Sequence, residues 1–342
     1  MRTGLTDLVG CRYPIVQTGM GYVAGARLAA ATSAAGGLGV IAASTMSVEQ
    51  MTAAIREVKE RTGAPFGVNI RSDAADAAER VEIMIREDVR VASFALAPRR
   101  ELIDRLKEAG VVTIPSVGAR RHAEKVAAWG VDAVIVQGGE GGGHTGPIPT
   151  TLLLPQVVDS VDIPVIAAGG FFDGRGLVAA MAYGAAGIAM GTRFLLTADS
   201  PVPDRVKQLY LEATDTLVTR NVDGVPHRVL ATPFVASLER TRLLRALVNA
   251  ARFKRLSGLS WRQLAAEGRR MRTGRQLTWA QVLMAANTPM LLRAAMVEGR
   301  TDLGVMAAGQ VVGVLDDLPS CEELIERIMA EAHETMRRLT PP

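Results

Sequence analysis

The sequence predicts an α/β fold in which eight βα units close into a barrel and a smaller, mainly helical subdomain follows. Short β-branched runs alternate with alanine-rich helical patterns along the first two hundred residues, which is typical of parallel α/β folds. There are eight such runs, whereas a doubly wound sheet usually has about five or six strands. After Phe194 the pattern becomes mainly helical. We therefore expect a TIM (β/α)8 barrel with a helical subdomain.

The expected strands follow one another through the barrel. They read YPIVQT, LGVIAA, FGVNI, VASFAL, VVTIPSV, AVIVQ, PVIAAG and GIAMGT. Glycine or polar residues follow each strand, as a βα connection requires. Helix-length segments then occur, for example at 49–61, 99–109 and 119–129.

The chain is expected to divide into three parts. We expect the barrel over residues 1–225, with 300–318 packing back on it, and a helical subdomain over 226–299. The helices expected after the barrel lie at 204–212, 238–256, 261–271 and 279–286, with an extended piece around VPHRVLATPF. A C-terminal helix is expected over 319–342, with Ser320 as its N-cap and Glu323 as the capping-box partner.

Composition narrows the class of protein. Hydrophobic residues make up 48% and charged residues 22% of the 342 positions, which predicts a folded chain with a sizeable core. No apolar run approaches the length of a membrane span and the N-terminus has no signal-peptide core, so we expect a cytoplasmic protein that does not bind membranes. Cys11 and Cys321 have no metal-binding spacing, so we expect no metal site and a reducing compartment.

The net charge of +4 is unevenly distributed. Between Arg240 and Arg275 there are eleven Arg or Lys residues and one acid, Glu267. Such a block is either a solvated helical face or a binding surface for an anionic ligand, protein or nucleic acid.

The loops after the seventh and eighth strands indicate a phosphate site. In TIM barrels the active site lies at the C-terminal ends of the strands, and phosphate commonly binds at these two loops. The loops contain Gly169 with Gly170 and Gly191 with Thr192, and Asp173 is placed to cap the following helix. Two glycine turns and a hydroxyl donor suit a phosphate dianion. The alternative is that both loops are only tight turns.

The stretch GGEGGGHTGPIP follows the sixth strand and contains a match to GxGxxG at Gly141, Gly143 and Gly146. In a dinucleotide-binding fingerprint the third glycine lies inside a helix, but here Pro147 and Pro149 keep the backbone extended. We therefore interpret the glycines as room for a flat ligand lying against the loop.

This loop also carries His144, which we expect to be a general acid or base near neutral pH. The alternative, a structural histidine, is less consistent with a glycine-rich loop at the end of a strand. His122 and His333 are typical of helix surfaces, whereas His227 is a second candidate for the pocket.

Polar side chains at other strand ends are expected at the same mouth. Gln17 and Met20 come from the first strand and its turn, Asn69 ends the third strand, and Gln137 ends the sixth. Planar amides that donate and accept hydrogen bonds suit the edge of a heteroaromatic ring. Each of them is alternatively a satisfied core group.

Taken together, these segments resemble the nitronate monooxygenase family and its relatives, the flavin-dependent enoyl-thioester reductases of fatty acid synthesis. The matching pieces are YPIVQTGM, AAGGLGVIAA, FGVNI, the Gly-Gly-His loop, PVIAAGG with DGRG, MGTRFLLT and AAGQVVGVLDDLPS. The resemblance implies an FMN-binding barrel with the smaller domain covering the flavin. It also implies that His144 is catalytic. The residues that match family contacts to FMN are Met20, Asn69, Gln137, Gly143, Gly169, Gly170, Gly191 and Thr192.

Two positions depart from the family pattern. Gly19 stands where proline usually precedes Met20, and the histidine loop has a Gly-Gly-Gly run between Glu140 and His144 where Ala-Gly-Gly is usual. The pieces QTGMGYVAGARL, GGEGGGHTGP and AANTPMLL are similar to actinobacterial FMN-dependent double-bond reductases acting on CoA thioesters in steroid C/D-ring degradation. The basic block would suit the phosphates of CoA.

The expected function is therefore an NADH- or NADPH-using reductase of a CoA-thioester double bond. The alternative is a nitronate monooxygenase that oxidises alkyl nitronates with oxygen, with His144 as base. A nucleic-acid-binding function is disfavoured, because the barrel and its histidine already account for the chain. Barrel dehydrogenases with a nucleophilic cysteine are excluded by the positions of both cysteines. The sequence does not decide between a monomer and a homodimer.

Overall fold

The computed structural model describes residues 1–95, 98–239 and 289–339. The chain divides into two compact units. The first comprises residues 1–141, 145–201 and 314–342, and the second comprises residues 142–144 and 202–313.

The first unit is a closed barrel of eight parallel strands, as the sequence predicted. The strands in barrel order are β1 (Ile15–Gln17), β2 (Leu38–Ala42), β3 (Phe66–Arg71), β4 (Val91–Ala95), β5 (Val112–Val117), β6 (Val134–Gln137), β8 (Val165–Ala168) and β9 (Gly187–Met190). Ile15 pairs with Ile188, so the last strand closes on the first. All eight strands coincide with the expected runs, which confirms the fold class.

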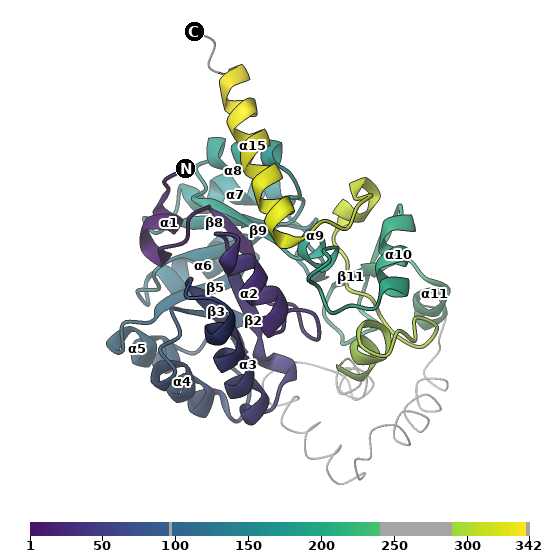
Figure 1. Ribbon diagram of the computed structural model, residues 1–342, viewed down its shortest axis with the longest axis horizontal. Helices are drawn as coiled ribbons and strands as arrows, with labels where there is room; N and C mark the ends of the chain where they lie inside the picture. Colours follow the sequence, from purple (N-terminus) through teal and green to yellow (C-terminus); the bar gives the residue numbers. More distant parts are fainter. Residues whose placement is uncertain (96–97, 240–288, 340–342) are drawn as a thin grey trace. The chain divides into compact units, whose positions relative to one another are not determined.

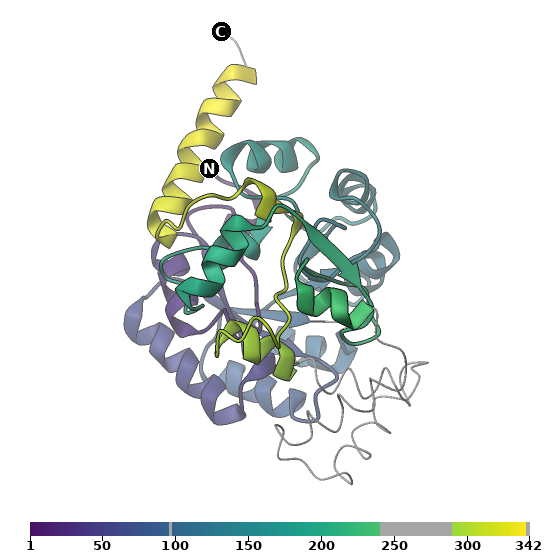
Figure 2. The same cartoon turned by 90° about the vertical axis from the view of Figure 1, so that its right-hand side faces the viewer.

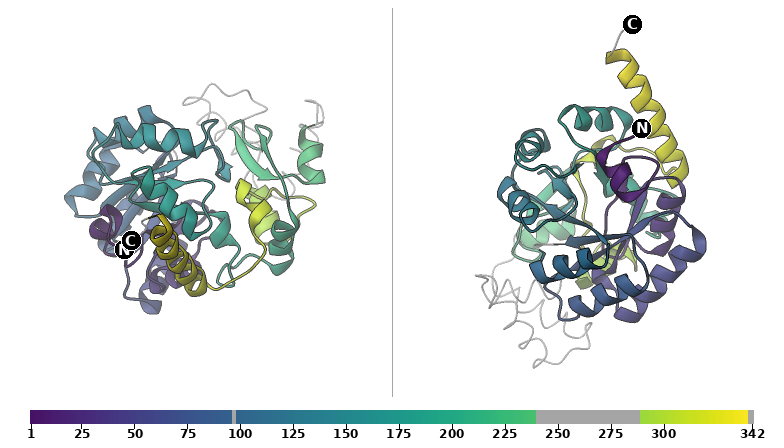
Figure 3. Two further views of the ribbon diagram at one scale, coloured as in Figure 1. Left: turned by 90° about the horizontal axis from the view of Figure 1, so that it is seen from above. Right: turned by 90° about the vertical axis from the view of Figure 1, so that its left-hand side faces the viewer.

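Helices surround the strands (Figure 3). They are α1 (Gly4–Val9), α2 (Ala26–Ala34), α3 (Val48–Arg61), α4 (Ala77–Arg86), α5 (Arg100–Glu108), α6 (Arg120–Ala127), α7 (Thr150–Val158), α8 (Gly174–Ala182) and the short α9 (Thr192–Leu195). A short 3₁₀ helix, η1 (Ala43–Thr45), follows β2. Buried aliphatic side chains such as Val40, Val91 and Ile135 fill the barrel, and Leu5 and Val9 of α1 pack against this core.

One glycine shows how closely the helices approach the strands. A Cβ on Gly39 of β2 would overlap the carbonyl oxygen of Ala29 on α2. Only a residue without a side chain fits there, so β2 and α2 are in direct backbone contact.

The C-terminal segment returns to the barrel and ends in α15 (Cys321–Leu339), which lies beside α8 and α2 (Figure 1). Ser320 and Glu323 form the expected cap, with the Ser320 N–H donating to Glu323 Oε2 at 2.8 Å. Asp317 is held by two guanidinium groups, at 2.8 Å from Arg193 Nη1 and 2.6 Å from Arg327 Nη1. Because Arg193 is 2% exposed, this contact ties the tail to the barrel through a buried charge.

The second unit contains a three-stranded antiparallel sheet in the order β10 (Thr216–Thr219), β11 (His227–Leu230), β7 (Gly143–His144). Its hairpin is drawn in green in Figure 2. The same unit contains the helices α10 (Asp204–Glu212) and α11 (Pro233–Glu239) and a helix over residues 289–296. The short 3₁₀ helix η2 (Gln310–Val314) follows later in the chain. A small core of Val222, Val229, Val235, Leu291 and Val305 supports it.

The expected helices at 261–271 and 279–286, most of the one at 238–256, and the whole basic block lie outside the described residues. Within the described part of the chain, no helix is both long enough and apolar enough to span a membrane.

Candidate active site

The mouth of the barrel is the candidate site of the first unit, and residues near the ends of its strands are anchored to their neighbours. Asn69 is 7% exposed, and its Nδ2 donates to Ser93 Oγ on the adjacent strand at 3.1 Å. A Cβ on Gly19 would lie 2.6 Å from Cβ of Asn69. The loop after β1 therefore closes directly on Asn69, which explains why glycine rather than proline stands before Met20.

Gln17 has a structural role. It is fully buried, its Nε2 donates to the carbonyl oxygens of Thr18 and Val40, and its Oε1 accepts from the Val40 N–H at 3.3 Å. The amide nitrogen and the amide oxygen of Gln17 are therefore both bonded to the backbone of Val40 on β2. Of the two interpretations open from the sequence, the satisfied core group is correct.

The loops after β1 and β9 meet at Met20. A Cβ on Gly191 would lie 3.3 Å from Thr18 Oγ1 and 3.5 Å from Met20 Sδ. The loop after β1 is further held by the Tyr22 N–H, which donates to Thr45 Oγ1 of η1 at 3.3 Å. Tyr22 has a φ of 65°, a conformation that costs a non-glycine residue free energy and persists where surrounding contacts fix it.

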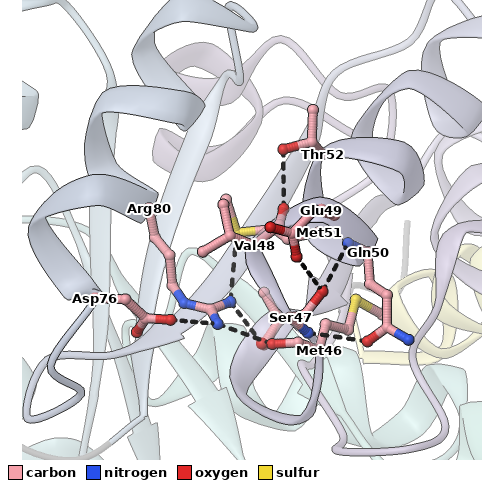
Figure 4. A network of polar contacts seen from close by, with 10 residues as sticks. Met46, Ser47, Val48, Glu49, Gln50, Met51, Thr52, Asp76 and Arg80 are labelled. Carbon is pink, nitrogen blue, oxygen red and sulfur yellow. Dashed lines mark hydrogen bonds and ion pairs between the residues drawn. The ribbon is translucent and has the colours of Figure 1, made fainter.

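A buried arginine fixes the loop after β2 that supplies Thr45 (Figure 4). Arg80 of α4 donates from Nη1 to the Ala43 carbonyl at 3.0 Å and from Nη2 to the Met46 carbonyl at 2.8 Å. Asp76 pairs with the same guanidinium at 2.8 Å. The hydrogen bond from Arg80 holds the pKa of Asp76 below its usual range, although burial opposes it. The network holds the loop after β2 against α4.

The predicted phosphate loops begin with glycines directly after β8 and β9. Gly169 and Gly170 follow β8 with φ values of 94° and 86°, a backbone region that favours glycine. A Cβ on Gly169 would also lie 3.1 Å from the Gly138 carbonyl oxygen, so this turn packs directly against the loop after β6. Asp173 caps α8 as expected, accepting from the Gly176 N–H at 2.8 Å. Thr192, 9% exposed, begins α9 directly after Gly191.

The glycine-rich loop after β6 is shaped mainly by its own contacts. A Cβ on Gly138 would overlap Thr150, one on Gly139 would lie 3.1 Å from the Gly146 carbonyl, and one on Gly141 would overlap Gln137. In the second unit, a Cβ on Gly142 would lie 2.6 Å from the backbone of residues 308 and 309. Our interpretation that a flat ligand explains the glycines is therefore wrong for these four. The loop folds on itself, and only Gly143 and Gly146 have more open surroundings.

Two side chains close the base of this loop. Thr145 Oγ1 donates to the Gly138 carbonyl at 3.3 Å and to the Gly139 carbonyl at 3.2 Å. Glu140 accepts from Thr150 Oγ1 at 2.7 Å and from the Thr150 N–H at 3.0 Å, at the first residue of α7. No helix begins at Gly146, which confirms that the GxGxxG match is not a dinucleotide fingerprint.

The second unit carries a candidate site of its own, where His144 belongs to β7. His144 Nε2 lies 2.5 Å from Asp223 Oδ2. The His144 and His227 rings pack edge to face, with centroids 4.7 Å apart and an interplanar angle of 61°. The side chain of His144 is 43% exposed, whereas those of Asp223 and His227 are 11% and 4% exposed. His144 is therefore the accessible member of a buried cluster.

The electrostatics of this cluster follow from burial and mutual contact. Burial raises the pKa of Asp223, but the hydrogen bond with His144 and the nearby imidazoles outweigh burial and hold it well below its usual range. Burial lowers the pKa of His227, His144 lowers it further, and Asp223 opposes both. Asp223 is ionised and His227 is neutral at neutral pH.

One atom of each of these three residues lies within 4.8 Å of the others, so the group could hold a metal ion. Asp223 was not singled out from the sequence. The Asp-Gly pair at 223–224, between two extended runs, is the hairpin signal that could have revealed it. His227 was a second candidate and does join His144. His122 and His333 lie exposed on helices, as expected.

Neither cysteine is available as a nucleophile. Burial raises the pKa of the Cys11 thiol to about 11 and that of the Cys321 thiol to about 12. Since the thiolate is the reactive form, both are inert near neutral pH.

Comparison with known proteins identifies the relatives of this chain. The family model described as nitronate monooxygenase matches residues 2–331. A Mycobacterium tuberculosis enzyme named (3aS,4S,5R,7aS)-5-hydroxy-7a-methyl-1-oxo-octahydro-1H-indene-4-carboxyl-CoA dehydrogenase is 64% identical over 341 residues, covering 97% of this chain and 96% of that protein. A Rhodococcus jostii enzyme of the same name is 62% identical over 338 residues, with coverage of 97% and 96%. The structure of FabK from Thermotoga maritima superposes with a TM-score of 0.81 at 36% identity, covering 99% of this chain and 98% of that one.

Proposed function

The chain belongs to the nitronate monooxygenase family and is a flavin-dependent oxidoreductase, and we propose that it interconverts a saturated CoA thioester and its α,β-unsaturated product. The observation that carries this proposal is identity of 62–64% over 97% of the chain to two enzymes named as dehydrogenases of an indene-carboxyl-CoA thioester. The matched region includes both the barrel mouth and the sheet that carries His144.

The chemistry of a thioester suits the residues present. The carbonyl of a thioester acidifies the proton on its α carbon, so a neutral imidazole is a suitable base for it. His144 would remove this proton in the oxidative direction and return it in the reductive direction. When bound, the flavin supplies the two-electron partner that exchanges a hydride with the β carbon. Proton and hydride together account for the two hydrogens of the C–C bond.

We propose FMN as the flavin, held at the barrel mouth. The backbone N–H groups of Gly169 and Gly170, together with the Thr192 hydroxyl, would bind its phosphate. The other assigned contacts are Met20, Asn69, Gln137, Gly143 and Gly191. The positive φ values after β8 support this assignment, because only glycine adopts two such residues in succession readily and glycine lets a ligand approach the backbone closely.

We propose that the acyl group is a hydroxylated, ketone-bearing bicycle like the one in the relatives' name. Their name gives the direction as dehydrogenation, and the reductase expected from the sequence runs the same hydride transfer in reverse. NADH or NADPH would feed electrons in the reductive direction.

The test is an anaerobic mixing experiment with the flavin-loaded full chain. The visible absorption band of the flavin is followed after addition of the indene-carboxyl-CoA thioester named for the relatives, of NADH, of NADPH, or of propyl-2-nitronate. Bleaching by the thioester supports dehydrogenation, and bleaching by a nicotinamide nucleotide supports the reductive direction. Bleaching by the nitronate alone would overturn the proposal in favour of nitronate oxidation, the activity for which the family is named.

The remaining expectations rest on the sequence. We propose that the enzyme acts in the cytoplasm and does not bind nucleic acid. The expected division into a barrel over 1–225 and a subdomain over 226–299 differs from the two compact units of the structure, in which residues 202–225 and 300–313 belong to the second unit. Light scattering with size-exclusion chromatography would decide between monomer and homodimer, and limited proteolysis would test the boundaries.

A further inference from the structure

The position of the His144 ring is set by strand pairing. In the antiparallel ladder between β7 and β11, His144 pairs directly with His227. Directly opposed residues of an antiparallel pair project to the same face, so the two rings meet edge to face. The imidazole of His144 is therefore held by a sheet rather than by a loose loop.

The carboxylate that touches this ring is itself fixed by the hairpin between β10 and β11. Asp223 Oδ1 accepts from the Val225 N–H at 3.1 Å, and Oδ2 lies 2.5 Å from His144 Nε2. The neighbouring Val222 is fully buried in the core of the second unit and anchors the turn. Oδ1 of Asp223 thus stabilises the turn, and Oδ2 contacts His144.

Asp223 is an anion in direct contact with His144, and the other charged groups described nearby are cations or imidazoles. On β11, His227 shares the face of His144, and Arg228 follows it on the opposite face, with Nη1 donating to Thr216 Oγ1 at 2.8 Å. On the hairpin, Arg220 is exposed. His227 is almost fully buried, and neither ring nitrogen makes a hydrogen bond within the described residues.

We propose that Asp223 is a positioning residue for His144, a role that rests on the proposed function. An ionised carboxylate accepts a hydrogen bond, so the neutral His144 ring must carry its hydrogen on Nε2 and its lone pair on Nδ1. When His144 takes the substrate proton, Asp223 stabilises the resulting imidazolium by charge. His227 packs against the ring and keeps it in this orientation.

The test compares wild type with Asp223→Asn, Asp223→Glu and the control Asp215→Asn, all as flavin-loaded full-length protein. Asp215 is an exposed carboxylate next to β10. Ring ¹⁵N chemical shifts of histidine-labelled protein give the tautomer of His144, with its signals assigned by His144→Gln. We expect the Nε2–H tautomer in wild type and in Asp215→Asn. In Asp223→Asn we expect this tautomer preference to be lost, because a carboxylate can only accept a hydrogen bond from Nε2, whereas a side-chain amide can also donate one.

Turnover provides a second readout. We expect Asp223→Asn to lower kcat by about 10²-fold or more with KM and flavin content near wild type, and Asp223→Glu to recover part of this loss. Asp215→Asn should match wild type.

The outcomes separate this proposal from the proposed function. A wild-type His144 that carries its hydrogen on Nδ1, or one whose tautomer is the same in wild type and Asp223→Asn, overturns the positioning role whatever the activity. The Nε2–H tautomer in wild type, lost in Asp223→Asn, in a protein that does not turn over the thioester supports the positioning of His144 and rejects the substrate assignment. One equivalent of a transition metal in the purified protein, removed by a chelator with a change in the His144 signals, would overturn the role, because the three side chains would then be ligands.

Discussion

The barrel mouth and the three-stranded sheet of the second unit are built in different ways. At the mouth, Gln137 ends β6 and Asn69 lies two residues before the end of β3, and parallel strands bring those ends to one edge. In the sheet, His144 and Asp223 are 79 positions apart and meet only through the pairing of β7 with β11. The mouth offers amides, glycines and backbone N–H groups, whereas the sheet offers titratable groups. The comparison teaches that the two regions gather their polar groups by different kinds of assembly, and it gives the proposed division between cofactor binding and proton transfer a structural basis that can be tested.

The largest effect that would sharpen this comparison is expected from His144→Ala. If the sheet supplies the proton-transfer group and the barrel binds the flavin, kcat should fall by about 10²–10⁴-fold while flavin content stays at the wild-type level. Steady-state kinetics and the absorbance ratio of flavin to protein measure the two quantities. His122→Ala on the exposed face of α6 is the matched control. Loss of flavin together with activity would break the division.

The next largest effect is expected on the thermal stability of the barrel. In Gly39→Ala the new methyl group would overlap the Ala29 carbonyl, so α2 must move away from β2. Overpacking of this kind costs about 3 kcal/mol, which lowers Tm by roughly 10 °C in a unit of this size. Thermal unfolding followed by circular dichroism measures it. Gly63→Ala, where no atom lies within 4 Å of the added carbon, should leave Tm unchanged, and equal Tm values for both variants would contradict the packing account.

Gly169→Ala is expected to have a smaller effect, and to weaken flavin binding rather than to lower kcat. The φ of 94° at Gly169 is unfavourable for alanine, and the added carbon would lie 3.1 Å from the Gly138 carbonyl. A strain of about 1–2 kcal/mol should weaken flavin binding by roughly tenfold. Saturating flavin should restore kcat, because the sheet is untouched. Fluorescence titration of the apoprotein gives the affinity, with Gly63→Ala again as control, and an unchanged affinity would remove Gly169 from the cofactor site.

The smallest effect concerns pH. Because the folded-state pKa of His227 lies below the ordinary value of about 6.5, the unfolded chain binds the proton more readily as the pH falls through about 6.5. The stability that neutral His227 contributes is therefore present above this pH and lost below it. Asp223 adds a loss only at much lower pH, because its folded-state pKa is depressed from an ordinary value near 4. We expect Tm to fall between about pH 7 and 5.5, and to fall less in His227→Gln.

The control for the pH experiment is His333→Gln, since His333 is exposed on α15. It should retain the wild-type dependence of Tm on pH. Identical slopes for wild type and His227→Gln would show that burial of His227 does not contribute to acid sensitivity.

The sequence was informative wherever the signal was local. Asp173 and Ser320 cap the helices that were expected to follow them, because an N-cap needs only the next three residues. It was less informative for Gln17, whose full burial depends on β2, and for the loop around Gly138, whose neighbours come from within the fold. The packing partner of a glycine cannot be deduced from the glycine alone.

By itself the sequence determined the eight-stranded barrel and the family, because strand periodicity, turn residues and motif spacing are properties of short segments, whereas the phosphate role of the loops after β8 and β9 and the catalytic role of His144 stay predictions. Only the tertiary structure decided that Asp223 and His227 join His144 and that Gln17 is structural. These contacts depend on which strands pair and in which register. Register is set by the packing of the whole unit, since a slip of one residue moves every side chain to the other face.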